Sequence, residues 1–437
     1  MSAPVDTNKK NKLLIISQDV IDCHMAGPGL RYSAMARFLA DSLQVTLAAP
    51  EGSDPGIAGV SFFTYGKDTR WLKAEALVAD FILVSGAMPR QFPFLVKCNA
   101  RLVVDLYDPM LFENLYYYED EKSSLRTRHI ADDLDTINIL AQAGDFFICG
   151  SERQRDLWLG LLLANHRINR LDVPGDPEFR KLIDVVGMGI PTRNLAGGGW
   201  LKGQHPQVPT KAKIVLWGGG IWNWLDPLTL IKSWPAVIQQ IPQVRLVFLG
   251  TRHPNPAVPQ HDMAQKALDL AGQIGELDKT ILFFDWISTT EREGLLSEAD
   301  VGVICHPQSI ETHFALRTRM LDYFWAQLPV VTSEGDVLSE VVRQHGVGWV
   351  VSPNDPEALA VALINALTCQ RAEIAQNYQP VLAAYDWSNQ LRPLLDYFIE
   401  QSGNTRPVKR KKPHQMRLAY RIKRKLSRLF HCMTVKA

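Results

Sequence analysis

The sequence predicts an α/β protein with two parallel sheets, each covered by helices on both faces. Short apolar runs alternate with segments that have apolar residues at helical spacing, and this order restarts near residue 210. In both halves a glycine turn follows the first apolar run. Short runs without polar interruptions are typical of strands buried on both faces, and strand–helix alternation is typical of parallel sheets. With 437 residues, the chain is long enough for two such domains.

In the first half, residues 12–17 form the first apolar run, and the turn Ala26-Gly27-Pro28-Gly29 precedes apolar residues at helical spacing over 30–43. Further strands are expected at four places, and an amphipathic helix is expected within 123–143. The four strand candidates are 44–49, 81–85, 102–105 and 146–149. These elements predict an N-terminal domain over residues 1–195.

The second half begins after a stretch rich in Gly, Pro and Asn, residues 192–210, which we interpret as a linker. The strand 213–217 runs into Gly218-Gly219-Gly220, and Asp226 followed by proline predicts a helix start. Ser288 and Glu291 have the spacing of a capping box. We expect a second domain over 210–385 and a C-terminal helix over 386–402, with a crossing back to the first domain as one option.

Composition excludes several classes of protein. The chain is 46% apolar and 21% charged, as in an average globular protein. No apolar run reaches the length of a transmembrane helix, and the six cysteines form no CxxC pair. Scattered cysteines are typical of reduced thiols, so we expect a cytoplasmic protein. Residues 401–437 hold twelve bases and no acid, which leaves 35 bases against 46 acids elsewhere. That acidic body is a poor candidate for a nucleic-acid surface.

Both glycine turns are candidate phosphate sites. A helix that begins after a glycine turn presents free N–H groups and the positive end of its dipole. We therefore expect Gly27, Gly29 and Arg31 in the first turn, and Gly219 and Gly220 in the second, to contact a phosphorylated ligand. Neither turn is GxGxxG or GxxxxGK[ST], which argues against dehydrogenases and P-loop NTPases. A simple tight turn is the alternative for each.

The segment 310–336 concentrates charge among apolar residues. Glu311, Arg317, Arg319 and Asp322 all lie within it, beside apolar residues at helical spacing. The planar guanidinium suits phosphate, so the two arginines are candidate phosphate ligands. The alternative is an ion pair between Arg319 and Asp322, which are three residues apart.

This segment resembles the signature of family 4 glycosyltransferases with the GT-B fold, which is a Glu, seven residues, a second Glu and a helix ending in Gly-x-Pro-Val. The match is Leu321-Asp322-Tyr323-Phe324-Trp325-Ala326-Gln327-Leu328-Pro329-Val330-Val331. Asp322 stands at the second Glu, and Glu311 is the nearest candidate for the first, which implies a three-residue insertion. Weaker similarities occur at 27–31, 143–152, 187–191 and 297–303. The basic pair that often follows the second glycine turn is replaced here by residues 222–226.

The resemblance implies two Rossmann-like domains facing a cleft, with the acceptor on the first and a nucleotide sugar on the second. It implies a retaining sugar transfer to a glycan or lipid-linked acceptor, without a metal or another cofactor, in cell-surface polysaccharide or glycolipid synthesis. Glu311 would hold the sugar, Asp322 the ribose, and Arg317, Arg319 or Arg252 the phosphates.

Three further residues or motifs lie outside the signature. Asp108 follows a strand end and is expected at the acceptor or the reacting sugar. Trp286 is expected to stack on the base, with a place in the core as the alternative. Asp133 and Asp135 fit a metal-binding DxD but lie in a predicted helix, so we expect no metal there.

The sequence is also compatible with two other functions. The altered acid spacing fits a GT-B body that has lost catalysis and serves as a scaffold tethered to a membrane. A nucleotide-sugar epimerase is the other alternative.

The basic tail, residues 403–437, predicts a membrane-surface helix. Leu418, Ile422, Leu426 and Leu429 share one face, and basic residues fill much of the remainder. Such a helix suits an anionic bilayer, where it would lie in the interface and hold the protein at the inner face of the membrane. A disordered solubilising tail and a nucleic-acid-binding tail are the alternatives.

Overall fold

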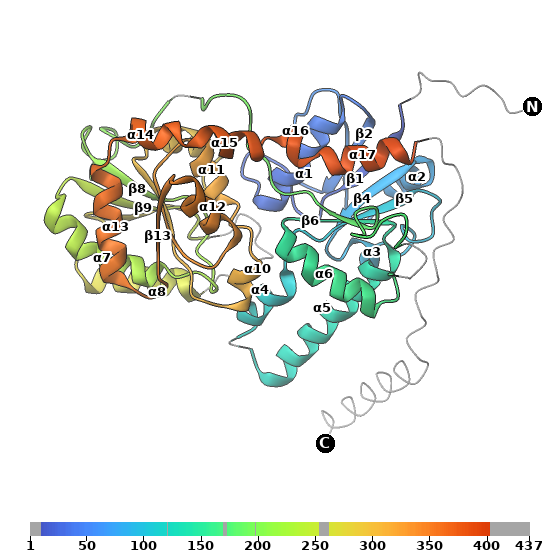
Figure 1. Ribbon diagram of the computed structural model, residues 1–437, viewed down its shortest axis with the longest axis horizontal. Coiled ribbons are helices and arrows are strands. Elements are labelled where there is room, and N and C mark those ends of the chain that lie inside the picture. Colours follow the sequence, from blue (N-terminus) through green and yellow to red (C-terminus); the bar gives the residue numbers. More distant parts are fainter. Residues whose placement is uncertain (1–9, 120, 169–172, 197, 253–261, 403–437) are drawn as a thin grey trace, which may run out of the picture.

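The computed structural model describes residues 10–402, except for residues 120, 169–172, 197 and 253–261. Two α/β domains lie side by side, and helices near the end of the described chain run across both of them (Figure 1). The basic tail 403–437, with the membrane-surface helix expected there, lies outside the described residues. No helix of the described part is both long and apolar enough to cross a membrane.

The first domain is built on a seven-stranded parallel sheet of order β3-β2-β1-β4-β5-β6-β7. Along β1, Leu14 and Ile16 enter one core while Leu13 and Ile15 enter the other, so the sheet is buried on both faces as the apolar runs predicted. The strands are β1 (Lys12–Ile16), β2 (Gln44–Pro50), β3 (Ser61–Tyr65), β4 (Phe81–Ser85), β5 (Arg101–Asp105), β6 (Phe146–Cys149) and β7 (Ile183–Val185). The helices are α1 (Gly27–Leu39), α2 (Arg70–Val78), α3 (Met88–Gln91), α4 (Met110–Tyr117), α5 (Ser123–Ala143) and α6 (Glu152–Ala164).

The second domain has a six-stranded parallel sheet of order β10-β9-β8-β11-β12-β13. Its strands are β8 (Lys213–Trp217), β9 (Val244–Phe248), β10 (Ile281–Phe283), β11 (Val301–Ile304), β12 (Val330–Ser333) and β13 (Gly348–Val351). Its helices are α7 (Pro227–Gln240), α8 (Asp262–Gln273), α9 (Thr289–Glu298), α10 (Ile310–Phe314), α11 (Arg319–Trp325), α12 (Val337–His345) and α13 (Pro356–Thr368). In both sheets the strand order reverses beside the first strand, where α/β folds bind ligands.

Local signals set the ends of two helices as predicted. The Asp226 side chain accepts a hydrogen bond from the Thr229 amide at the start of α7, and Pro227 takes a first-turn position. Ser288 and Glu291 form a reciprocal capping box at the start of α9. Both caps use side chains within three residues of each other, which is why a sequence pattern could reveal them.

The chain crosses between the domains a second time near its C-terminus, through α14 (Arg371–Gln376), α15 (Tyr378–Ala384), α16 (Trp387–Gln390) and α17 (Arg392–Glu400) (Figure 1). Tyr378 belongs to the core of the second domain, whereas the Phe398 ring lies 4.7 Å from that of Phe81 in the first. The two crossings touch, because the Ile190 amide donates to the Tyr385 carbonyl at 2.7 Å. The segment 386–402, expected as one helix, forms the two helices α16 and α17 and packs on the first domain.

The expected loose linker, residues 192–210, instead packs on the second domain for much of its length. Leu201 and Val208 are fully buried in that domain's core. The Glu298 carboxylate accepts hydrogen bonds from the amides of Trp200 and Lys202. Gly and Pro in this segment serve an irregular but ordered backbone, which composition alone does not distinguish from a flexible one.

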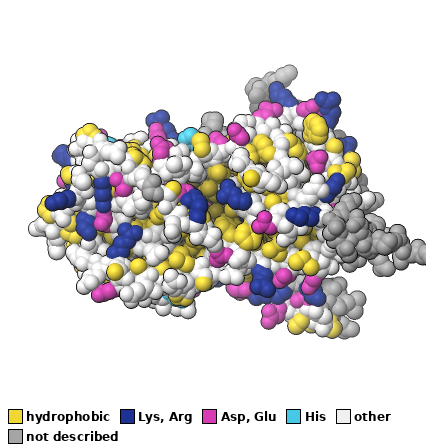
Figure 2. Space-filling view, turned by 90° about the horizontal axis from the view of Figure 1, so that it is seen from above, with side chains coloured by type: hydrophobic (Ala, Val, Ile, Leu, Met, Phe, Trp, Pro, Cys, Tyr) yellow, Lys and Arg dark blue, Asp and Glu magenta, His cyan; other side chains and the backbone are white. Residues whose placement is uncertain are grey.

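The domains also meet beside the cleft, through α10. Arg153 of α6 donates to the carbonyls of His313 and Gly335, at 3.1 and 2.7 Å. The rings of Phe112, on α4, and Phe314, on α10, stack with centroids 5.4 Å apart. On the face shown in Figure 2, basic and acidic side chains are interspersed over both halves of the molecule.

Candidate active site

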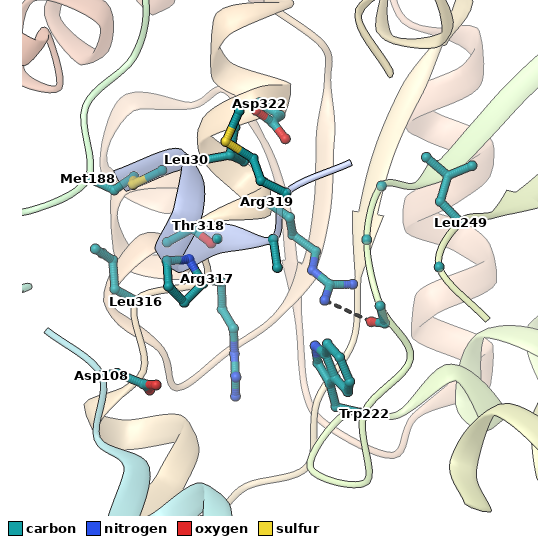
Figure 3. Close-up of a pocket in the computed structure, with 18 of the residues that line it drawn as sticks. Leu30, Asp108, Met188, Trp222, Leu249, Leu316, Arg317, Thr318, Arg319 and Asp322 are labelled. Carbon is teal, nitrogen blue, oxygen red and sulfur yellow. Dashed lines mark hydrogen bonds between the residues drawn. The ribbon is translucent and has the colours of Figure 1, made fainter. Parts of the chain in front are cut away.

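A cavity of about 400 Å³ opens between the domains, at the carboxyl ends of their first strands. The first domain contributes the start of α1, the loop after β5 and part of α4. The second contributes residues 218–225, 249–250, 286–292 and 315–322. Figure 3 shows Asp108 on one side of this cavity, with Arg319 and Trp222 on the other.

Arg319 brings a positive charge to the cavity without a carboxylate hydrogen-bonded to it. Its Nη2 donates to the Gly220 carbonyl at 2.8 Å, while Nη1 is buried without a hydrogen-bond partner among the described residues (Figure 3). Burial lowers the pKa of Arg319 to about 10, so the group stays charged at neutral pH. A desolvated cation with an unused donor is the arrangement that a bound anion would complete.

Tyr323 of α11 holds the glycine loop close to this arginine. Its hydroxyl accepts from the Gly218 amide at 2.7 Å and lies 2.9 Å from the Leu216 carbonyl, to which it can donate. A Cβ atom at Gly302 would lie 2.4 Å from the Tyr323 ring, so this strand residue must lack a side chain for α11 to pack so closely. The loop and Arg319 are thus positioned by one helix.

Arg317 also lines the cavity, but a carboxylate neutralises it. Both of its terminal nitrogens donate to Glu311, at 2.8 and 2.6 Å, and the Nε atom is buried without a partner in the described structure. Glu311 is fully buried and lies outside the cavity lining. The glutamate therefore orients Arg317 from behind.

Arg292 is a third arginine at the cavity. Its Nη1 lies 3.4 Å from Asp322 Oδ2, and both residues line the space. Burial raises the pKa of Asp322, while Arg292 acts in the opposite direction. The Nε atom of Arg292 is buried and unpaired within the described part of the chain.

The first domain presents carboxyl groups instead. Asp108 and Glu113 line the cavity and share a hydrogen bond. Burial raises the pKa of Asp108 to about 6. Burial, and next the charge of Asp108, hold the pKa of Glu113 well above its ordinary value. Their shared hydrogen bond raises the pKa of Glu113 and lowers that of Asp108, so Glu113 is the donor and Asp108 the acceptor.

The start of α1 faces the same space. Ala26, Gly27, Pro28 and Leu30 line it, no side chain caps the helix, and its first turn holds no acid. This end of α1 is therefore open to an anion.

Comparison with known proteins identifies one of the two domains. Residues 212–369 match the family described as glycosyl transferases group 1. The second domain is a group 1 glycosyl transferase domain. Over 190 residues the chain is 25% identical to the phosphatidyl-myo-inositol mannosyltransferase of Mycobacterium tuberculosis, and the match covers 41% of this chain and 45% of that protein. The chain thus spans less than half of the length of the curated relatives it matches.

Solved structures share the whole two-domain architecture. Sucrose-phosphate synthase from Thermosynechococcus elongatus superposes with a TM-score of 0.59 at 14% identity, over 90% of this chain and 99% of that one. Anabaena HepE, solved with UDP and glucose, gives 0.61 at 15% identity, over 89% and 99%. Trehalose 6-phosphate synthase from Burkholderia multivorans gives 0.62 at 15%, over 91% and 100%. These likenesses confirm the GT-B fold expected from the resemblance to the family 4 signature.

The cavity brings together eight of the residues that the sequence singled out, and both domains contribute to this set. The eight are Gly27, Asp108, Gly219, Gly220, Trp286, Arg317, Arg319 and Asp322. Five segments along the chain, some of them loops and some helix starts, supply them.

Four expected ligands lie elsewhere. Arg31 is fully buried, with Nε 2.6 Å from Asp105 and two further nitrogens bonded to backbone carbonyls, so it serves the fold. A Cβ at Gly29 would lie 2.9 Å from Met25, so this glycine serves loop packing. Arg252 is exposed outside the cavity lining, and Glu311 lies behind Arg317.

The sequence pattern did not reveal Glu113 or Arg292 as residues of the cavity. Each lies one helical turn beyond a loop that was recognised, Glu113 after Asp108 and Arg292 after the Ser288 cap. A search for charged residues in the first turn of the helix after each strand would have found both.

Asp108→Asn is expected to stabilise the unliganded protein at neutral pH. A carboxyl with a raised pKa binds its proton more tightly in the folded state, so its ionisation costs stability above that pKa and costs nothing at low pH. Because Asp108 is only partly buried, solvent screens part of this cost, and we expect a gain of roughly 1–2 kcal/mol at pH 7.5 that vanishes near pH 4. Urea unfolding at both pH values measures it. The exposed Glu119→Gln is the control, and equal stability of Asp108→Asn and wild type at pH 7.5 would contradict the raised pKa.

Proposed function

We propose that the protein transfers a sugar from a nucleoside-diphosphate sugar to a hydroxyl group of an acceptor. The bond between the anomeric carbon and the β-phosphate oxygen breaks, and the nucleoside diphosphate leaves with the electron pair. The acceptor oxygen bonds to the anomeric carbon and loses its proton. The observation that carries the proposal is the charged Arg319, which lines the interdomain cavity of a group 1 domain with an unused buried donor.

The charge that develops on the departing diphosphate determines what the site must do. Arg319 lies beside the loop Gly218–Gly220, and both line the same cavity as the open start of α1. Donors that are fixed before the reaction stabilise developing charge without reorganising, which is the largest single contribution in many enzymes. Arg317, oriented by Glu311, adds a second guanidinium with its unused Nε.

The proposed roles of the other residues follow from the resemblance to the family 4 signature. Asp322, next to Arg292, is proposed to accept hydrogen bonds from the ribose, and Trp286 to lie against the base. Glu311 does not line the cavity, so we propose that it contributes by orienting Arg317 rather than by contacting the sugar. Retention of the anomeric configuration and transfer without a metal are proposed on the resemblance of residues 321–331 to family 4 enzymes.

The acceptor is proposed to be a glycan or a lipid-linked sugar of a surface polysaccharide or glycolipid. Support comes from one relative, whose name places its mannosyl transfer on phosphatidyl-myo-inositol. The composition of residues 403–437 supports attachment at the cytoplasmic face of an anionic membrane.

Release of a nucleoside diphosphate from UDP-, GDP- and dTDP-sugars tests the proposal. We expect release from at least one donor, faster when an acceptor is added, and an increase in melting temperature with the matching nucleoside diphosphate. An epimerase would instead return an altered nucleotide sugar without acceptor dependence. If every donor is left unchanged and no nucleoside diphosphate stabilises the protein, the proposal is wrong.

A further inference from the structure

The two walls of the cavity carry opposite charge. Among its described lining residues, the first domain contributes three acids, Asp19, Asp108 and Glu113, and neither Lys, Arg nor His. The second domain contributes three arginines and one acid to the same lining. The wall of the second domain thus favours an anion, and the wall of the first domain favours an uncharged polar group.

One first-domain cation lies close behind this wall, but its hydrogen bonds all go to the protein itself. Arg31 lies beneath it, with its guanidinium 4.6 Å from the centre of the Tyr107 ring, but its donors go to Asp105 and to the carbonyls of Val186 and Gly187. No other first-domain charge in the described lining would offset a phosphate. In the proposed function the start of α1 stabilises the donor diphosphate.

Nor do the arginines of the opposite wall serve an acceptor phosphate. In the proposed function Arg317, through its unused Nε, already serves the donor diphosphate, and Arg292 Nη1 lies 3.4 Å from Asp322 Oδ2. Arg319 bonds to the glycine loop, where the proposed function places the donor diphosphate. A second phosphate in the cavity would meet the acids of the first domain.

Uncharged hydroxyl groups suit this acidic wall. The Asp108–Glu113 pair shares one hydrogen bond and has further carboxyl oxygens with which to accept hydrogen bonds from a sugar. Leu30, Met188 and Leu316 add apolar surface beside it, which suits the C–H face of a sugar ring (Figure 3).

We propose that the acceptor enters this cavity through an uncharged, hydroxyl-rich sugar unit that is bound by Asp108 and Glu113, and that sugars phosphorylated on that unit are rejected. Any phosphate of a larger acceptor then lies outside the cavity. The inference rests on the proposed function and adds the class of acceptor to it.

Matched pairs of sugars test the inference: glucose with glucose 6-phosphate, mannose with mannose 6-phosphate, and fructose with fructose 6-phosphate. Each pair is compared in transfer from the active donor, and in binding to the full chain saturated with the nucleoside diphosphate that stabilises it. We expect the neutral sugar to be favoured at least tenfold in one pair or more, and the phosphorylated sugar in none. A preference for any phosphorylated sugar, or no difference in all three pairs, including no binding of either sugar, overturns the inference.

Variants separate recognition from folding. Glu113→Ala, which removes the carboxyl oxygens that would accept hydrogen bonds from the sugar, should lower kcat/KM for the neutral sugar at least tenfold while the donor KM stays within twofold. Glu113→Lys should reduce the discrimination against the phosphorylated partner. Glu119→Gln, on the exposed end of the same segment, is the control and should match wild type. Wild-type acceptor kinetics in both Glu113 variants would overturn the assignment.

The outcomes also distinguish the inference from the proposed function. If the protein neither binds a nucleoside diphosphate nor releases one from a donor, the proposed function is wrong. Normal donor turnover with a preference for phosphorylated sugars overturns only the acceptor class.

Discussion

Replacing Arg319 with methionine is expected to lower kcat/KM for sugar transfer by about 100- to 1000-fold, the usual effect of removing one fixed donor to a developing oxyanion. The guanidinium bonds to the Gly220 carbonyl and keeps Nη1 unused beside the cavity. Burial lowers its pKa to about 10, so the charged form costs stability in the unliganded protein. Methionine removes that cost, and we expect the unliganded variant to be as stable as wild type, or more stable by roughly 1–2 kcal/mol.

Thermal unfolding with and without UDP or GDP, together with steady-state kinetics, checks both effects. The nucleotide that stabilises wild type should fail to stabilise Arg319→Met, because only a ligand that binds the folded state shifts its melting temperature. Arg319→Lys should recover part of the activity, since lysine keeps the charge but not the planar fork. Arg343→Met, at an exposed ion pair of the same domain, is the control. Normal turnover in Arg319→Met would remove the basis of the proposed function.

Arg31→Met is expected to destabilise the protein by about 3–5 kcal/mol, the usual cost of removing one partner from a buried ion pair. The guanidinium and the Asp105 carboxylate are both fully buried, and Arg31 also ties the loop at Val186 and Gly187 to α1. The substitution leaves the buried Asp105 carboxyl with fewer hydrogen-bond donors. Urea unfolding measures the loss.

A double variant separates the lost charge balance from the lost packing. Arg31→Met combined with Asp105→Asn leaves no unpaired charge and should recover a substantial part of the stability. Nucleotide affinity of the folded Arg31→Met protein should stay within twofold of wild type, because Arg31 lies outside the cavity lining. A stable Arg31→Met protein that no longer binds nucleotide would restore the phosphate role expected from the sequence.

These two arginines look alike in the sequence. Each lies at or near the start of a helix, and both were expected to contact phosphate. In the structure Arg31 meets Asp105, 74 positions away, while no carboxylate is hydrogen-bonded to Arg319. Their different roles depend on which distant carboxylate the fold brings near, and this is not encoded in the residues around either arginine.

Local patterns predicted much of the fold. Strand and helix periodicity depends on which faces are buried, and the Asp226 and Ser288–Glu291 caps depend on residues within one turn. Two parallel-sheet domains were therefore predictable from these patterns, although the edge strands β3 and β13 were not. The GT-B fold was expected from the resemblance of residues 321–331 to the family 4 signature.

Only the tertiary structure decided which charged groups are available to a ligand and which are paired within the protein. Glu311 closes on Arg317, Asp108 meets Glu113, and the segment 192–210 packs on the second domain. An ionisable side chain changes its chemistry when it is desolvated and when an opposite charge is nearby, and both conditions depend on segments far away in the sequence. The sequence by itself determined where the cavity would form, and the packing of distant segments determined which charges face it.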